Sequence, residues 1–177
     1  MVTLNTGTLS LRKSVDATLT ELWLTQLSRL PSMEKVDVEK FKIVCLALMP
    51  KFKPKDGRTF CNFFVQAVCH EFDNKEFEHM RANQIFDSCE KLHKKYSPDT
   101  AYKLSFEGVV VLAAWKNPDS KKSGHVALVY PEGPMIFSGK WGIYCPKIAQ
   151  AGWAAPRGAN HGFFKPPTYF GLAAAFG

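Results

Sequence analysis

The sequence predicts an α+β fold, with helices in the first half of the chain and strands in the second. Apolar residues recur at helical spacing up to about residue 95. Short continuous apolar runs, bounded by turn residues, follow from residue 108 onward. Of the 177 residues 46% are hydrophobic and 22% are charged, a composition typical of a globular domain rather than of a disordered chain.

The chain is expected to begin with helices. Leucines and a tryptophan recur three or four residues apart over residues 16–29, and a second apolar helical face follows over residues 41–48 until Pro50 ends it. Residues 1–50 would thus form an N-terminal helical segment. We expect it to pack on a core formed by residues 51–177, within a single domain.

Two further helices are expected before the strands. The first covers residues 59–72, with Thr59 as its N-cap, and carries phenylalanines four residues apart. The second begins at Glu76 or Arg81 and ends near Lys95. The Ser-Pro-Asp sequence at residues 97–99 is expected to be a break.

The apolar runs of the second half predict a sheet. The residues between them, such as the polar stretch 117–124, are turn formers. The tail after residue 162 is rich in glycine, proline and aromatic residues. The expected strands cover residues 108–115, 125–130, 135–137 and 147–151.

The balance of 23 basic against 16 acidic residues gives a net charge of +7. This charge suits an anionic partner, and it equally suits simple solubility. No apolar run reaches the roughly 18–20 residues of a membrane span, so no span is expected. The first residues lack a charged start followed by an apolar block, so we expect no cleaved secretory signal.

The five cysteines are widely spaced and form no CxxC pair, which excludes a disulfide framework or a zinc pattern. We expect most of them to be reduced core thiols. Cys61 differs because it begins a predicted helix, where the partial positive charge and free N–H groups favour a thiolate. The same N–H groups could hold an oxyanion, although a small buried hydrophobic role is the alternative.

A cysteine nucleophile needs a base that is near it in space, and His125 at the start of a predicted strand is the best candidate. His161 is a weaker one, and the other histidines, at 70, 79 and 93, are expected at the surface. If strand 147–151 pairs antiparallel with the His125 strand, the Gln150 carbonyl would accept a bond from Nδ1–H of the imidazole. Ser138 and Asn160 remain alternatives for this orienting role.

Further polar and aromatic residues are open to two interpretations. Asn83 either lines a substrate cleft with its neighbours or caps a helix, and Asn62 either shapes the site or makes local backbone bonds. The tryptophans at 115, 141 and 153 and the Phe163-Phe164 pair could line a groove for glycan or peptide, although most aromatic residues are core.

Five segments, in a fixed order along residues 56–170, resemble papain-like cysteine amidases and peptidases of the cell-wall type, the CHAP and NlpC group. Similar motifs occur in phage- and bacterium-encoded proteins of that group. The segments are Thr59-Phe60-Cys61-Asn62, Arg81-Ala82-Asn83-Gln84, Ala114-Trp115-Lys116-Asn117-Pro118, Gly124-His125-Val126-Ala127 and Ile148-Ala149-Gln150-Ala151-Gly152.

The resemblance implies a papain-like α+β fold and peptidoglycan hydrolysis by a thiol mechanism, acting as endopeptidase or amidase without a metal or cofactor. It implies Cys61 as nucleophile, His125 as base and Gln150 as third residue, with Asn62 and Trp115 at the substrate or oxyanion side. Peptidoglycan is then the expected partner. The expected site of action is the cell wall or periplasm, reached from the cytoplasm by phage-type release or by secretion. An immunity protein or a secretion component is a further possible partner.

Two alternatives remain open. A cysteine hydrolase or deamidase toxin could act on a protein substrate with the same nucleophile. A basic non-catalytic module for nucleic acid is the other, but the basic residues form no recognisable reader motif, and we expect no nucleic-acid partner. Alkylation separates these classes, because a catalytic Cys61 should react faster than the other thiols and His125→Ala should slow it.

Overall fold

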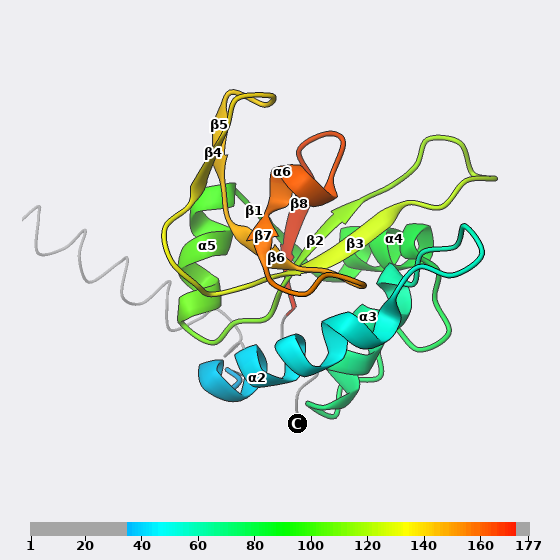
Figure 1. The fold of residues 1–177 in the computed structure, drawn as a ribbon, viewed down its shortest axis with the longest axis horizontal. Coiled ribbons are helices and arrows are strands. Elements are labelled where there is room, and N and C mark those ends of the chain that lie inside the picture. Colours follow the sequence, from blue (N-terminus) through cyan, green and yellow to red (C-terminus); the bar gives the residue numbers. More distant parts are fainter. Residues whose placement is uncertain (1–34, 173–177) are drawn as a thin grey trace, which may run out of the picture. The chain divides into compact units, whose positions relative to one another are not determined.

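The computed structural model describes residues 35–172 and confirms the α+β class. The helix expected over residues 16–29 lies outside the described residues. The described helices are α2 (Val38–Leu48), the 3-10 helix η1 (Met49–Phe52), α3 (Cys61–His70), α4 (Ala82–Leu92), α5 (Pro98–Phe106) and the short α6 (Ala159–Gly162). Figure 1 shows their order along the chain.

Six strands form one antiparallel sheet in the order β1-β8-β2-β3-β6-β7. The strands β4 and β5 form a separate hairpin, which extends away from this sheet (Figure 1). The bounds are β1 (Lys94–Tyr96), β2 (Val111–Trp115), β3 (His125–Val129), β4 (Ile136–Ser138), β5 (Ile143–Cys145), β6 (Lys147–Ala149), β7 (Arg157–Gly158) and β8 (Thr168–Gly171).

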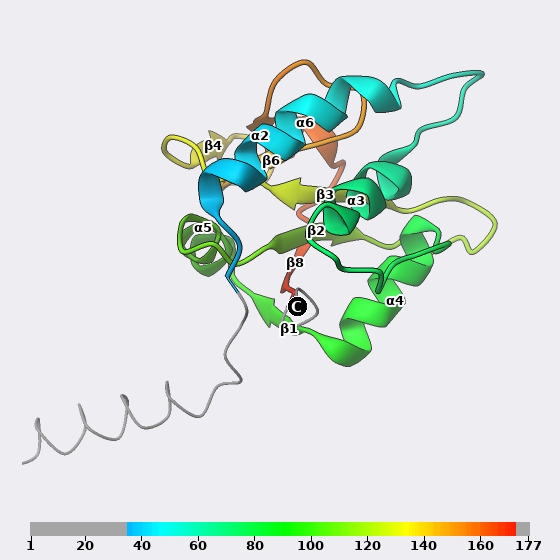
Figure 2. The ribbon, with the colours of Figure 1, turned by 90° about the horizontal axis from the view of Figure 1, so that it is seen from below.

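The central strands are buried on both faces, which explains their continuous apolar sequences. Alternate residues of β3 point to opposite sides: Val126 and Leu128 join a core cluster with α2, α3 and α4, whereas Ala127 and Val129 join a second cluster with α5 and α6. In Figure 2 the central strands lie between α5 on the left and α3 and α4 on the right. Helices α2, α3 and α4 therefore share one core with the strand that carries His125.

The helix expected from Thr59 begins instead at Cys61, and Thr59 is not its cap. The preceding loop folds back on itself, with a bridge between Lys55 and Arg58 and positive φ angles at Asp56 and Gly57. The chain leaves this turn before it becomes helical, so the first helical hydrogen bond runs from Phe64 N–H to the Phe60 carbonyl. The later start places the Cys61 side chain in the first turn.

The break expected at residues 97–99 is the start of helix α5 instead. The Ser97 hydroxyl accepts a hydrogen bond from the Thr100 N–H at 3.2 Å, and Pro98 occupies the first helical position, where its missing N–H costs nothing. Sequence patterns also extended the fourth helix to Lys95, but it ends at Leu92 and β1 follows. Strand β8, in the tail, pairs between β1 and β2.

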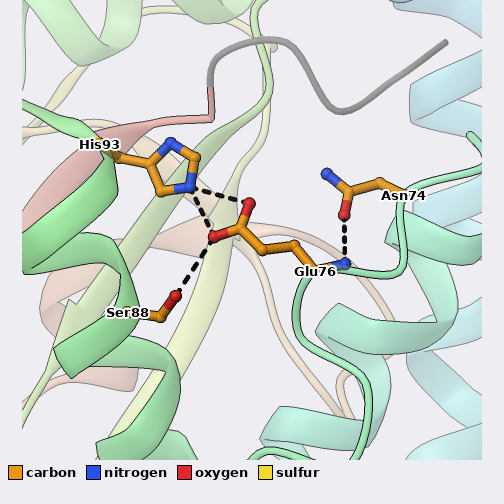
Figure 3. A network of polar contacts seen from close by, with 4 residues as sticks. All are labelled: Asn74, Glu76, Ser88 and His93. Atoms are coloured by element: carbon orange, nitrogen blue, oxygen red, sulfur yellow. Dashed lines mark hydrogen bonds and ion pairs between the residues drawn. The ribbon is translucent and has the colours of Figure 1, made fainter.

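His93 was expected at the surface, but its side chain is buried, with only 4% of it exposed. Its Nε2 lies 2.7 Å from a carboxylate oxygen of Glu76, which also accepts a bond from the Ser88 hydroxyl at 3.4 Å. Figure 3 shows this network, in which the Asn74 side chain holds the Glu76 backbone. The charged neighbours of His93 in sequence suggested exposure, whereas its partner lies 17 residues away. The other two histidines expected at the surface, His70 and His79, are exposed.

Candidate active site

Cys61 lies in the first turn of helix α3, and buried residues further along this helix fix its position. Phe64, Val65 and Val68 of α3 are fully buried in the core cluster, so the start of the helix is held against the sheet. Cys61 itself is 2% exposed. The backbone N–H groups of Asn62 and Val126 both donate hydrogen bonds to its sulfur. Cys61 therefore lies where helix α3 meets strand β3.

His125 is the first residue of β3, and the loop before it is clamped by Asn83 of α4. The Asn83 carbonyl accepts a hydrogen bond from the Asn117 N–H at 3.0 Å, and its amide donates to the Lys122 carbonyl at 3.1 Å. A Cβ on Gly124 would overlap Asn83 Oδ1 and the Trp115 carbonyl, so only glycine allows this approach. Asn83 is not the helix cap, because that position is Arg81.

Gln150 orients the His125 ring. Imidazole Nε2 donates a hydrogen bond to Gln150 Oε1 at 2.7 Å, and the ring of Phe163 packs against the imidazole at 4.8 Å between centroids. Strand β3 pairs antiparallel with β6, which meets the condition that the sequence left open. Gln150 directly follows β6 and does not lie within it, because the strand ends at Ala149. The predicted atom was wrong, because Nε2 and not Nδ1 contacts the carbonyl. Nδ1 is thereby left to face Cys61.

The two other candidates for the orienting role lie elsewhere. Ser138 is fully buried in β4, and its hydroxyl accepts a bond from the Trp141 N–H at 3.3 Å. Asn160 Oδ1 lies 3.6 Å from the sulfur of Cys145. His161, the weaker candidate base, is exposed on α6. Among the candidates raised by the sequence, the structure brings together Cys61, His125 and Gln150.

The electrostatics of the pair favour a thiolate and an imidazolium. Burial acts to raise the pKa of the Cys61 thiol, but the His125 imidazole and the two backbone N–H groups outweigh it and lower the pKa below its ordinary value of 9.0. Burial acts to lower the pKa of His125, but hydrogen bonds to Cys61 and Gln150 and the charge of Cys61 outweigh it and raise the pKa above 6.5. Each group thus stabilises the charged form of the other.

The other four cysteines lack such a partner and are free and buried. Burial raises the pKa of Cys69 to about 12, with a further contribution from the Glu76 charge. Burial also raises the pKa values of Cys45, Cys89 and Cys145. Because the thiolate is the reactive form, these four thiols are chemically inert near neutral pH.

A pocket of about 120 Å³ opens over the three residues. Trp153 lines it, as one of the aromatic residues considered from the sequence. Trp115 is opposite His125 in the sheet register but is not part of the pocket lining. The opposite wall comes from Phe52 of η1 and from the loop that leads into α3, which contributes Pro54 and Phe60. The lining residues are Phe52, Pro54, Thr59, Phe60, Cys61, His125, Gln150, Ala151, Gly152 and Trp153.

Asn62 contributes its backbone to the site and its side chain to the fold. Its N–H bonds to the Cys61 sulfur. Its side-chain amide donates to the Met80 carbonyl at 3.0 Å, and Gln66 of the same helix donates to the same carbonyl at 2.7 Å. The two amides therefore tie α3 to the segment that leads into α4. The Asn62 side chain thus makes no local backbone bond, and Asn62 does not line the pocket over Cys61.

No protein-family model matches the chain, and no curated protein matches it. Within residues 35–172, no group of three or more histidine, cysteine or acidic residues is arranged to hold a metal ion. The described helices include none that is long and apolar enough to cross a membrane. The interpretation of the site thus depends on its geometry and on the motifs of the sequence.

Proposed function

We propose that this protein is a cysteine hydrolase of papain-like architecture that cleaves an amide bond in the peptide of bacterial peptidoglycan. The observation that carries the proposal is the set Cys61, His125 and Gln150, in which a helix-terminal thiol faces an imidazole whose second nitrogen is held by a carbonyl at 2.7 Å. This arrangement provides a nucleophile, a proton carrier and a group that orients it.

The chemistry follows from the positions of these groups. The Cys61 thiolate attacks the carbonyl carbon of the scissile amide, and backbone N–H groups of the first turn of α3 stabilise the resulting oxyanion. Imidazolium Nδ1 of His125 then donates its proton to the leaving amine as the C–N bond breaks, which leaves a thioester on Cys61. His125 next takes a proton from water, which attacks the thioester carbonyl and releases the carboxylic acid and the thiol.

Gln150 has a positioning role in this cycle. Its carbonyl accepts the Nε2–H bond throughout, so the ring cannot rotate and Nδ1 stays directed at the sulfur. The same bond stabilises the imidazolium, which must persist until the amine leaves. The narrow pocket over Cys61 suits an extended peptide with small side chains near the scissile bond.

Two features support a wall substrate in particular. The five motifs at Thr59–Asn62, Arg81–Gln84, 114–118, 124–127 and 148–152 resemble cell-wall amidases and peptidases in their order. The net charge of +7 also draws the protein to an anionic polymer, with an attraction that salt weakens. The proposed site of action is thus the wall, reached by phage-type release or by secretion.

Digestion of purified peptidoglycan, followed by mass spectrometry of the soluble fragments, tests the proposal and identifies the bond. Wild type should release fragments and Cys61→Ala should release none. Cys69→Ala is the matched control, because Cys69 is a buried cysteine of the same helix and should leave release intact. Fragment release by Cys61→Ala would refute the proposal, as would deamidation of protein glutamine by a wild type that leaves peptidoglycan uncut.

A further inference from the structure

A second, larger cleft of about 600 Å³ opens beside the catalytic pocket, between the start of α4 and the loop that joins β2 to β3. Its lining carries four basic side chains and no carboxylate, and no aromatic ring. We call it the cationic cleft. Its lining residues are Arg58, Arg81, Asn83, Gln84, Ser120, Lys121, Lys122 and Ser123.

The charge of the cationic cleft is largely uncompensated. Within the described residues, the lining takes part in one ion pair, in which the Lys122 ammonium lies 3.7 Å from the Asp119 carboxylate. Both side chains are well exposed. Such a pair contributes little. Arg58, Arg81 and Lys121 take part in no ion pair within the described part of the chain. Four cations brought together with a single exposed counter-charge repel one another, and an anionic ligand would relieve this repulsion.

The side-chain carbonyls of both amides in the lining already accept hydrogen bonds, so the cleft offers a ligand mainly hydrogen-bond donors and positive charge. The Asn83 side chain bonds the β2–β3 loop on both of its polar atoms. The Gln84 carbonyl accepts a hydrogen bond from the Arg81 N–H at 2.8 Å. The groups left for a ligand are the two guanidinium groups, the two ammonium groups, the Gln84 amide N–H groups and the serine hydroxyls.

The cationic cleft adjoins the catalytic residues through the chain itself. Arg58 precedes Cys61 by three residues and Ser123 precedes His125 by two. Their Cα atoms are thus at most about 11 Å and about 8 Å apart, given 3.8 Å per residue. A peptide whose scissile amide lies over Cys61 can therefore reach the cationic cleft with groups one or two residues away from that amide.

We propose that the cationic cleft binds free carboxylate groups of the substrate peptide and so selects where the peptide is cut. This inference rests on the proposed function. The planar guanidinium groups of Arg58 and Arg81 match a carboxylate with two parallel hydrogen bonds. Nucleic acid fits less well, because the lining offers no aromatic ring on which a base could stack.

The test measures binding in the full-length Cys61→Ala variant, which cannot turn the ligand over. The probes are a fluorescein-labelled wall stem tetrapeptide with free carboxylates and the same peptide with amidated carboxylates, followed by anisotropy. Arg58→Gln/Arg81→Gln removes the two arginines of the cationic cleft. Lys75→Gln/Lys103→Gln is the matched control, because it removes the same charge from two exposed lysines outside the cleft.

The free-carboxylate peptide should bind about tenfold more weakly for each arginine removed, since a hydrogen bond to a charged group contributes about that factor. The amidated peptide should be insensitive to the arginines, and the control should bind both peptides as the parent does. Equal binding of the two peptides by the parent, or an unchanged affinity in Arg58→Gln/Arg81→Gln, would overturn the inference. Tighter arginine-dependent binding of polyphosphate or single-stranded DNA than of the peptide would overturn it too.

The outcomes also separate this inference from the proposed function. Carboxylate-dependent binding by a protein whose wild type fails to cut peptidoglycan would support the cationic cleft and reject the hydrolase. Cutting of peptidoglycan by wild type, without any effect of the arginines on peptide binding, would reject the cationic cleft alone.

Discussion

The hydrogen bond from His125 to Gln150 should set the protonation of the imidazole, and Gln150→Leu tests this. The variant keeps a side chain of similar size but removes the carbonyl at 2.7 Å from Nε2. That carbonyl favours the charged form of the ring, because Nε2–H donates to it more strongly when the ring is an imidazolium. Its loss should therefore lower the pKa of His125, which is raised above 6.5 in the wild type.

The size of the effect follows from the geometry of a single short bond. A hydrogen bond to a charged group contributes about 1.5–3 kcal/mol, and one pKa unit corresponds to about 1.4 kcal/mol. Gln150→Leu should thus lower the pKa of His125 by about one to two pH units. Gln150→Glu should act in the opposite direction, because a carboxylate in the same place stabilises the imidazolium further.

Nuclear magnetic resonance titration of the imidazole ring provides the assay. The measurement is made in the Cys61→Ala background, so that titration of the thiol does not overlap that of the ring. An unchanged or raised His125 pKa in Gln150→Leu would refute the assigned role of Gln150.

Three further predictions concern the residues that support the site and the fold. Gly162→Ala should lower the His125 pKa as Gln150→Leu does, because its Cβ would overlap Gln150 Oε1, whereas Gly139→Ala has open space around it and should change nothing in the same titration. Asn83→Ala should lower the free energy of unfolding in urea by about 2 kcal/mol, because each of the two lost hydrogen bonds contributes about 1 kcal/mol. An unchanged midpoint of the urea unfolding curve would show that these bonds to the β2–β3 loop do not stabilise the fold. Glu76→Ala should lower the free energy of unfolding by about 1–3 kcal/mol, because it removes the carboxylate that bonds the buried His93 side chain. Glu78→Ala removes an exposed partner of His70 and should lower it by less than about 1 kcal/mol. Equal losses of the two variants in urea unfolding would contradict the burial argument.

The strands and helices that are marked by a local pattern of apolar residues were predictable from the sequence. Continuous apolar runs identified β2 and β3, because a strand buried on both faces needs apolar residues at every position. The same patterns identified a strand at β6, and its antiparallel pairing with β3, which the sequence offered only as a condition, brings Gln150 near His125. Helix α5 does not follow from the pattern, because Ser-Pro at residues 97–98 is typical of a helix break, although the same two residues also cap and begin a helix.

The residues that depend on distant partners were not predictable. His93 looked exposed because its neighbours are charged, and only the fold supplies Glu76. Asn83 looked like a helix cap, but its side chain turns to a loop more than 30 residues away. The nitrogen of His125 that faces Gln150 also depends on where β6 lies relative to β3, which residue types alone do not give.

The central claim is that the Cys61 thiolate is the nucleophile that cuts the wall peptide. Partial alkylation with iodoacetamide near neutral pH, peptide mapping of the label and assay of fragment release from peptidoglycan test it in one sample series. The lowered pKa of Cys61 predicts that label accumulates there first and that activity falls in proportion, reaching zero at full labelling of Cys61. Activity that survives complete alkylation of Cys61, or is lost while Cys61 stays unlabelled, would contradict the claim.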